Sequence, residues 1–194
     1  MLKKLQDEEF SFKLVYITGF SNIKISYIEI EEEIEKIQNK YSVIIQFFNS
    51  QLIASWEHLF FSVIHSLKAF NQGNNISNKL ELEILLYASA QHQIKVAIER
   101  FGINEEIQNV AMIILGNSMD DIENSKLKII ELIKGTENES VLKIDGKKYE
   151  SICKNFNIKQ LEIDTTSVTR KQDDKLDALK EIILNRIAFV IFEK

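Results

Sequence analysis

Proline is absent from the sequence, and cysteine occurs once, as Cys153. A chain with a single cysteine forms no internal disulfide, which is typical of proteins that work in a reducing compartment. No apolar stretch is as long as a membrane-spanning helix requires, and the N-terminal segment MLKKLQDEEF lacks the apolar core of a signal peptide. We therefore expect a soluble, cytoplasmic protein with no membrane segment.

A surplus of basic charge is also absent. Lysine and arginine number 24, aspartate and glutamate number 29, and the formal net charge is −5. Proteins that coat nucleic acids without sequence preference are usually basic, so this balance disfavours that class. Any RNA contact must come from a small local patch, a helix end or a partner subunit.

The motifs of common catalytic and cofactor-binding sites are missing too. The chain has no P-loop, GxGxxG, GxSxG or HExxH motif. His58 and His65 are seven residues apart, too far for a metal pair on adjacent helical turns, so we interpret the histidines as surface or interface residues. Cys153 has no histidine near it in the sequence and is expected to fill the core. We predict no metal, no cofactor and no catalytic residue.

Apolar residues, in contrast, are plentiful. Hydrophobic residues make up 45% of the 194 residues and include 12 Phe, enough for a sizeable core. Short apolar runs predict strands at 12–20, 42–48 and 109–115, and the run SVIIQFF at 42–48 is typical of a buried central strand. The segment VLKID at 141–145 predicts a short edge strand. Apolar residues at helical spacing predict helices over residues 27–37, 56–70, 80–88, 93–101, 120–134, 147–155 and 176–192.

Strand and helix patterns alternate through the chain, with no internal repeat and no Gly/Ser linker. We predict one compact domain over residues 1–194 of the α/β (α+β) class, a small β-sheet with helices packed on it. Gly73 is expected to end the helix that starts at residue 56, and a break is expected at 88–91. The polar, charged stretch at 165–175 is predicted to be a mobile loop.

The segment from Asn49 to Ile103 is the most distinctive part of the chain. Its combination NIS…LLYAS…QI resembles the small kinase-binding subunit family of the KEOPS complex, the TPRKB (PRPK-binding protein) type. Motif or structural positions within this resemblance are Asn49, His58, Glu83, Tyr87 and Gln93. Of these, His58 and Tyr87 are expected to pack within the domain or to support the polar turn. Archaeal relatives lead us to expect Gly and Arg at the positions of Ala90 and His92.

The resemblance implies a regulatory subunit that is not an enzyme. Members of the family bind the small kinase/ATPase subunit of KEOPS and the 3′ CCA end of tRNA, which helps to recruit the substrate. The complex makes N6-threonylcarbamoyladenosine next to the anticodon, and its other subunits perform the chemistry. Because His92 is only partly charged at neutral pH, RNA binding at that position is expected to be weaker or pH-dependent.

We predict the RNA contact around the polar turn that precedes the helix at 80–88. Side-chain amides, backbone N–H groups and a lysine suit a single-stranded RNA end, and a helix N-terminus suits a phosphate. The predicted RNA-binding residues are Asn74, Asn75, Ser77, Lys79, His92 and Lys95. The kinase contact is predicted to be an apolar patch with a polar rim.

Each of these interpretations has an alternative. Asn75 and Ser77 are also typical of residues that close a turn, and Ser77 or Asn78 with Glu81 predicts a capping box at the helix start. For the whole chain, the alternatives are a stand-alone small α/β enzyme or small-ligand-binding protein, and a structural dimerisation protein.

Overall fold

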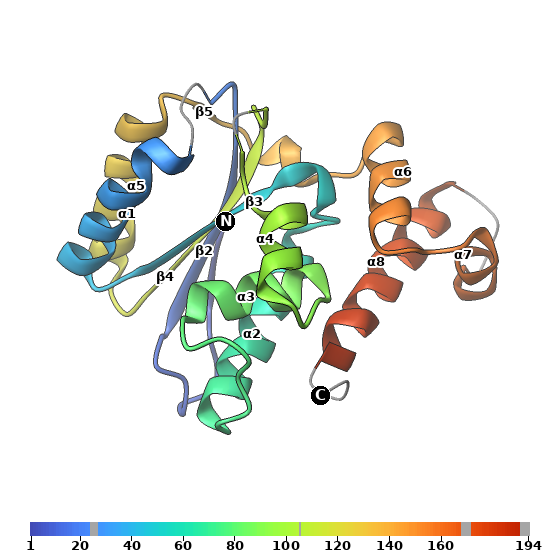
Figure 1. Cartoon of the computed structure of the whole chain (residues 1–194), viewed down its shortest axis with the longest axis horizontal. Helices are drawn as coiled ribbons and strands as arrows, with labels where there is room; N and C mark the ends of the chain where they lie inside the picture. Colours follow the sequence, from blue (N-terminus) through green and yellow to red (C-terminus); the bar gives the residue numbers. More distant parts are fainter. Residues whose placement is uncertain (24–26, 105, 168–171, 191–194) are drawn as a thin grey trace.

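The computed structural model describes residues 1–23, 27–104, 106–167 and 172–190. One small sheet carries helices on both of its faces (Figure 1). The strands are β1 (Leu2–Lys4), β2 (Leu14–Ser21), β3 (Ile44–Asn49), β4 (Val110–Gly116) and β5 (Thr136–Glu137). The helices are α1 (Tyr27–Tyr41), α2 (Trp56–Asn71), α3 (Leu80–Ser89), α4 (Ile94–Phe101), α5 (Met119–Ile133), α6 (Gly146–Asn155), α7 (Gln160–Thr166) and α8 (Gln172–Phe189). The predicted small sheet with helices packed on it, in a single compact α+β domain, is confirmed.

The sheet is antiparallel. Its strand order is β1-β2-β4-β3, and β5 pairs with β2 outside this path. Strands β2 and β4 form the centre and pair from Leu14 opposite Gly116 to Phe20 opposite Val110. The antiparallel pairing places the domain in the α+β class, apart from folds built on a parallel sheet.

Strand β4 shows how two layers of helices share one sheet. Its side chains alternate between the two faces, as they do in any strand. Val110, Met112 and Ile114 join one apolar cluster, while Ala111, Ile113 and Leu115 join the other. Helices α1 and α5 cover the first cluster, and α2, α3 and α8 cover the second (Figure 1). Because both faces are covered, β4 is an unbroken apolar run in the sequence.

The prediction of a central strand at 42–48 is wrong in position. Strand β3 lies at the edge of the sheet and pairs with β4 alone. Its sequence is apolar because α1 contacts it on one side and α3 and α4 on the other. Two of its backbone groups bond side-chain amides instead of a further strand. The Ile45 N–H donates to Gln38 Oε1 at 2.6 Å, and the Gln46 amide donates to the Phe47 carbonyl at 2.6 Å.

The helices nearest the candidate site end where the sequence predicts. Helix α2 begins after Ser55, whose hydroxyl accepts a hydrogen bond from the His58 N–H at 3.3 Å. It ends before Gly73, whose φ of 66° is in the left-handed region that favours glycine. Helix α3 ends before Ala90, which is also left-handed, with φ of 48°. The predicted stop at Gly73 and break at 88–91 are both confirmed.

The shortest elements are those that the sequence pattern did not predict correctly. Residues 141–145, predicted as an edge strand, are the end of a 3₁₀ turn (Glu139–Leu142) and a connection to α6. Strands β1 and β5 and helix α7 have no counterpart in the prediction, because three, two and seven residues are too few to establish a period. The predicted loop at 165–175 is helical at both ends, in α7 and α8, and 168–171 lie outside the described residues.

Candidate functional site

The predicted RNA-binding residues fall into two groups at opposite ends of α3. Asn74, Asn75, Ser77 and Lys79 precede the helix, whereas His92 and Lys95 follow it. Helix α3 has ten residues, which corresponds to a length of about 15 Å. The six residues therefore form two separate groups and not one continuous patch.

The turn before α3 is held together by the carboxylate of Glu83. This side chain is fully buried and accepts hydrogen bonds from the backbone N–H groups of Ile76 at 3.0 Å and Ser77 at 2.7 Å. The Asn75 amide donates to the Ser77 carbonyl at 3.0 Å, and the Ser77 hydroxyl accepts from the Lys79 N–H at 3.1 Å. The interpretation of Asn75 and Ser77 as residues that close the turn is confirmed.

The predicted capping box at this turn is wrong. Helix α3 starts at Leu80, and its N-cap residue is Lys79, which makes no side-chain capping bond. Glu83 replaces the expected cap by accepting two N–H groups from outside the helix. Lys79 also lines a cavity of about 360 Å³ together with Glu31 and Glu81. Two carboxylates near this lysine weaken the case for a phosphate site at the turn.

A pocket with a different character lies beyond the other end of α3. We call it the basic pocket; its volume is about 370 Å³. Its lining comes from the α3–α4 turn, α4, the end of α6 and the end of α8, through Ala90, Gln91, Arg100, Asn155, Phe156, Asn157, Arg186, Phe189 and Val190. Two of these described lining residues are charged, and both are arginines. The side chain of Arg186 donates to the Phe156 carbonyl and to Glu162, the latter at 2.8 Å.

The lining of the basic pocket suits a nucleotide. Arg100 is exposed at the end of α4 and presents a guanidinium, which matches the geometry of a phosphate. The side chains of Gln91, Asn155 and Asn157 supply amides of the kind that read base edges, and the exposed Phe189 supplies an aromatic ring of the kind on which bases stack. Sequence reasoning missed this combination because α6 and α8 lie far along the chain from α3.

The α3–α4 turn itself departs from the pattern of the resemblance. Ala90 adopts the left-handed conformation that glycine would adopt without strain, at a cost on the order of 1 kcal/mol. His92 is half-buried and Gln93, just before α4, is exposed. Lys95 is exposed and lies 3.9 Å from Glu99. Position 92 lacks the expected arginine, so the exposed Arg100 is the main source of positive charge at the basic pocket, whereas the charge of Arg186 is offset by Glu162.

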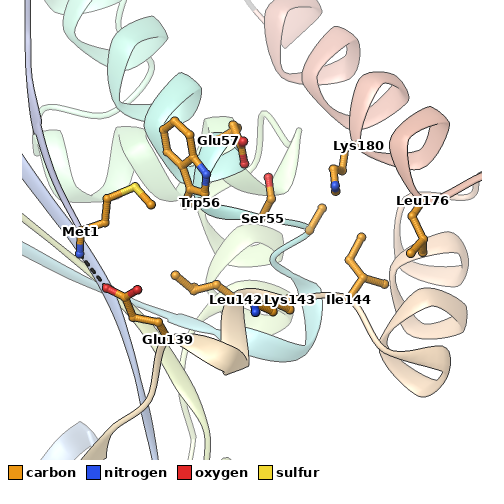
Figure 2. A pocket seen from close by; sticks show the side chains of 11 residues that line it. Met1, Ser55, Trp56, Glu57, Glu139, Leu142, Lys143, Ile144, Leu176 and Lys180 are labelled. Carbon is orange, nitrogen blue, oxygen red and sulfur yellow. Dashed lines mark hydrogen bonds and ion pairs between the residues drawn. The ribbon is translucent and has the colours of Figure 1, made fainter. Parts of the chain in front are cut away.

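A second pocket, which we call the apolar pocket, lies between the start of α2 and α8 (Figure 2). Its volume is about 370 Å³. It is lined by Met1, Ala54, Ser55, Trp56, Glu57, Glu139, Leu142, Lys143, Ile144, Leu176 and Lys180. Figure 2 shows the ammonium group of Met1 directed at the Glu139 carboxylate, at a distance of 2.9 Å. Apolar side chains thus form much of its wall, and both signs of charge occur at its rim.

The apolar pocket continues into a row of aromatic rings along α2. The ring centroids of Trp56 and Phe60 are 6.0 Å apart, as are those of Phe60 and Phe61. Phe61 is 40% exposed. The Lys3 ammonium lies 4.2 Å from the centroid of the Trp56 ring. A partly exposed aromatic row beside an apolar pocket is the kind of surface that anchors a protein partner.

His58 lies between the two pockets and is fully buried, so its interpretation as a surface histidine is wrong. Its Nδ1 accepts a hydrogen bond from the Ala54 N–H at 3.1 Å, and its Nε2 lies 2.8 Å from the Ala88 carbonyl. A backbone N–H can only donate and a carbonyl can only accept, so the hydrogen is on Nε2. Burial lowers the pKa of His58 from 6.5 to about 4, and the ring is therefore neutral at physiological pH.

Two other positions of the resemblance, Tyr87 and Asn49, make contacts within the domain. Tyr87 is buried and stacks on the His65 ring at 5.8 Å, and burial raises its pKa to about 12. Asn49 caps the 3₁₀ turn after β3 by accepting from the Gln51 N–H at 3.1 Å. The packing of His58 and Tyr87 within the domain is thereby confirmed.

The remaining residue that the sequence singled out is Cys153. Cys153 is half-buried and packs against the core, as expected, and burial raises the pKa of its thiol. The described residues contain no group of three or more His, Cys, Asp and Glu side chains placed to hold a metal. Within the same residues, no helix has both the length and the apolar character needed to cross a membrane.

Comparison with known proteins gives one family and two relatives. The family model described as "Kinase binding protein CGI-121" matches residues 20–190. The EKC/KEOPS complex subunit CGI121 of Candida albicans is 30% identical over 132 residues, which cover 66% of this chain and 64% of that protein. The regulatory protein Cgi121 of Methanocaldococcus jannaschii is 32% identical over 114 residues, covering 59% of this chain and 70% of that protein.

The matches cover different shares of the chain and of its relatives. The chain spans a little less than two thirds of the Candida albicans relative. The family model, in contrast, extends from the end of β2 to the end of α8 and includes both pockets except for Met1. The chain therefore belongs to the CGI-121 family of kinase-binding proteins.

Proposed function

We propose that this protein is a non-catalytic regulatory subunit of a cytoplasmic KEOPS-type tRNA-modification complex. Its two relatives are named as a KEOPS subunit and a regulatory protein, which supports the proposal. In this role the chain binds the kinase/ATPase subunit and the 3′ CCA end of tRNA, and other subunits make N6-threonylcarbamoyladenosine. The observation that carries the proposal is the pair of pockets with different chemistry that flank His58.

The kinase subunit is assigned to the apolar pocket and the aromatic row of α2. Protein interfaces typically have an apolar centre in which aromatic residues are enriched, surrounded by a polar rim. Trp56, Leu142 and Leu176 supply the centre, while Lys143 and Glu57 supply the rim. Tryptophan at such a position is often responsible for a large share of the binding energy.

The 3′ end of tRNA is assigned to the basic pocket. A CCA end is single-stranded, so its recognition needs stacking faces, amides and a few phosphate contacts. The guanidinium of Arg100 and the amides of Gln91 and Asn157 match those needs. Of the residues predicted from sequence, His92 and Lys95 lie at this end of α3, and the group from Asn74 to Lys79 is proposed as a second, weaker contact.

Two measurements test the proposed function. The purified chain is expected to co-purify with its cognate kinase subunit and to stimulate the ATPase activity of that subunit. It is also expected to bind intact tRNA more tightly than tRNA from which the CCA end has been removed. Failure to bind an active cognate kinase contradicts the first assignment. Equal affinity for intact and trimmed tRNA contradicts the second.

A further inference from the structure

The imidazole of His58 makes one hydrogen bond toward each pocket. Nδ1 accepts from the N–H of Ala54, which lines the apolar pocket with the adjacent Ser55. Nε2–H donates to the carbonyl of Ala88, two residues before Ala90 in the lining of the basic pocket. The ring is fully buried between these two segments, and Ala54 and Ala88 are 34 residues apart in the chain.

The His58 ring also packs against two phenylalanine rings. The His58 and Phe156 ring centroids are 5.9 Å apart with planes inclined at 62°, and Phe156 lines the basic pocket. Phe101, at the end of α4, completes a triangle of rings, with its centroid 6.4 Å from that of His58 and 5.5 Å from that of Phe156. His58 thus contacts a lining residue of each pocket: it is hydrogen-bonded to Ala54 of the apolar pocket, and its ring packs against Phe156 of the basic pocket.

We propose that His58 is a positioning residue for both binding sites, through two independent hydrogen bonds. The bond at Nδ1 positions the backbone of the apolar pocket, and the bond at Nε2 positions the backbone next to the basic pocket. This inference rests on the proposed function, because it assigns the kinase subunit to one pocket and the RNA end to the other. Through Nδ1 the ring fixes Ala54 and the direction in which α2 presents Trp56. Through Nε2 it fixes the end of α3. Two backbone hydrogen bonds close the turn there: the Ala90 N–H donates to the Tyr87 carbonyl, and the Gln91 N–H donates to the Leu86 carbonyl, both at 3.0 Å.

The side chains of asparagine and glutamine separate the two bonds. The Oδ1 of asparagine takes the place of Nδ1 and accepts from Ala54, but asparagine is too short to reach Ala88. The Nε2–H of glutamine takes the place of the imidazole Nε2–H and donates to Ala88, but leaves the Ala54 N–H without its acceptor. If His58 only filled the core, the asparagine and glutamine variants would not differ in which ligand they bind more weakly.

The test measures two affinities for each variant. One ligand is the cognate kinase subunit, and the other is a single-stranded RNA oligonucleotide that ends in CCA. His58→Asn is expected to bind the kinase within twofold of the wild-type protein and to bind the RNA about tenfold more weakly, as expected for one lost buried hydrogen bond. His58→Gln is expected to show the reverse pattern, and His58→Leu to weaken both.

The controls separate this inference from the proposed function. Ser66→Ala removes a 2.8 Å hydrogen bond inside α2 from a buried residue that lines neither pocket, and is expected to change neither affinity. Leu176→Asp and Arg100→Glu test the two pockets directly. If these two variants bind their ligands normally, the proposed function fails. If they lose binding while His58→Asn and His58→Gln weaken both ligands equally or neither ligand, only the positioning role fails.

A measurement on the wild-type protein decides the case in which a His58 variant does not fold. The two ring nitrogens give separate ¹⁵N NMR signals. Titration with the CCA-ended RNA is expected to shift the Nε2 signal more than the Nδ1 signal, and titration with the kinase subunit to do the opposite. Equal shifts, or no shift in either titration, overturn the positioning role.

Discussion

The apolar and basic pockets have nearly the same volume, about 370 Å³ each, but their linings differ in kind. In the apolar pocket, Trp56 and Leu176 contribute surface that gains from leaving water, and lysines and glutamates of the rim balance one another. In the basic pocket, Arg100 and Arg186 stand among three amides, and no carboxylate occurs among the described lining residues. Pocket size therefore says little about the ligand, whereas the side chains that line it say much.

The difference also explains how an acidic protein can bind RNA. The chain has a net charge of −5, so long-range attraction does not steer a polyanion to its surface. Attraction must be local, and the basic pocket supplies the exposed guanidinium of Arg100 beside Arg186, which is paired with Glu162. Much of the negative charge lies elsewhere, for example on Glu32, Glu33 and Glu35, which are exposed on α1, the helix that covers the opposite face of the sheet.

The largest expected effect is the loss of folding stability when low pH protonates His58, the residue that contacts both pockets. Its folded-state pKa of about 4 is below the ordinary 6.5, so the unfolded chain binds more protons between these values. The stabilisation is complete above about pH 6.5 and is lost as the pH falls towards 4, by about 3 kcal/mol. Urea unfolding of the wild-type protein at pH 7 and pH 4 should show a loss larger by about this amount than in His58→Gln, which has no titrating ring. Parallel pH profiles contradict this account.

Leu176→Asp is expected to break the apolar pocket alone. A carboxylate in the half-buried position weakens kinase binding by about 2 kcal/mol, roughly 30-fold. The affinity for the CCA-ended RNA should stay within twofold, because Leu176 does not line the basic pocket. Isothermal titration with the kinase subunit measures the effect. Leu127→Asp, the same change at a 50% exposed leucine of α5 on the other face of the sheet, should bind the kinase normally.

Arg100→Glu is expected to break the basic pocket alone. Reversing the charge weakens binding of the CCA-ended RNA by about tenfold or more, since a charged hydrogen bond to phosphate is replaced by repulsion. Fluorescence anisotropy of a labelled oligonucleotide measures the change. Lys128→Glu, a charge reversal on α5, is the matched control. The same loss in both variants means that general charge and not the pocket governs RNA binding.

Lys79→Glu is expected to have the smallest effect and sharpens the position of the RNA site. The turn before α3 is about 15 Å from the basic end of that helix, beyond the Debye length of about 8 Å at physiological salt. The affinity for RNA should therefore fall by about threefold at most. A loss as large as that of Arg100→Glu moves the main RNA contact to the turn from Asn74 to Lys79.

What the sequence reveals about the fold depends on the length of each pattern. Strand β4 and helix α2 are recognisable because their apolar residues recur over seven and sixteen positions. The apolar run of β3 shows correctly that both of its faces are buried, but the same pattern arises at an edge covered by helices. Strand β5, with two residues, has no periodicity to detect.

The candidate site is less visible in the sequence, because its parts come from distant segments. The polar turn before α3 is recognisable from its residues, yet its anchor is Glu83, six positions beyond Ser77, and not the expected capping box. The basic pocket joins Arg100 to Arg186, and only the packing of α8 beside α2 and α3 brings them together. The packing of His58 within the domain follows from the resemblance, but its neighbours Phe101 and Phe156 come from later segments and could not be identified from the sequence.

The most direct test of the two-pocket account is a binding measurement with both ligands present. The chain is first saturated with its kinase subunit, and the CCA-ended RNA is then titrated into the complex. Separate pockets predict that the RNA binds the saturated complex with the kinase still attached, as sedimentation of all three components together would show. Displacement of the kinase by the RNA, one molecule for one, would contradict the account because it requires a single shared site.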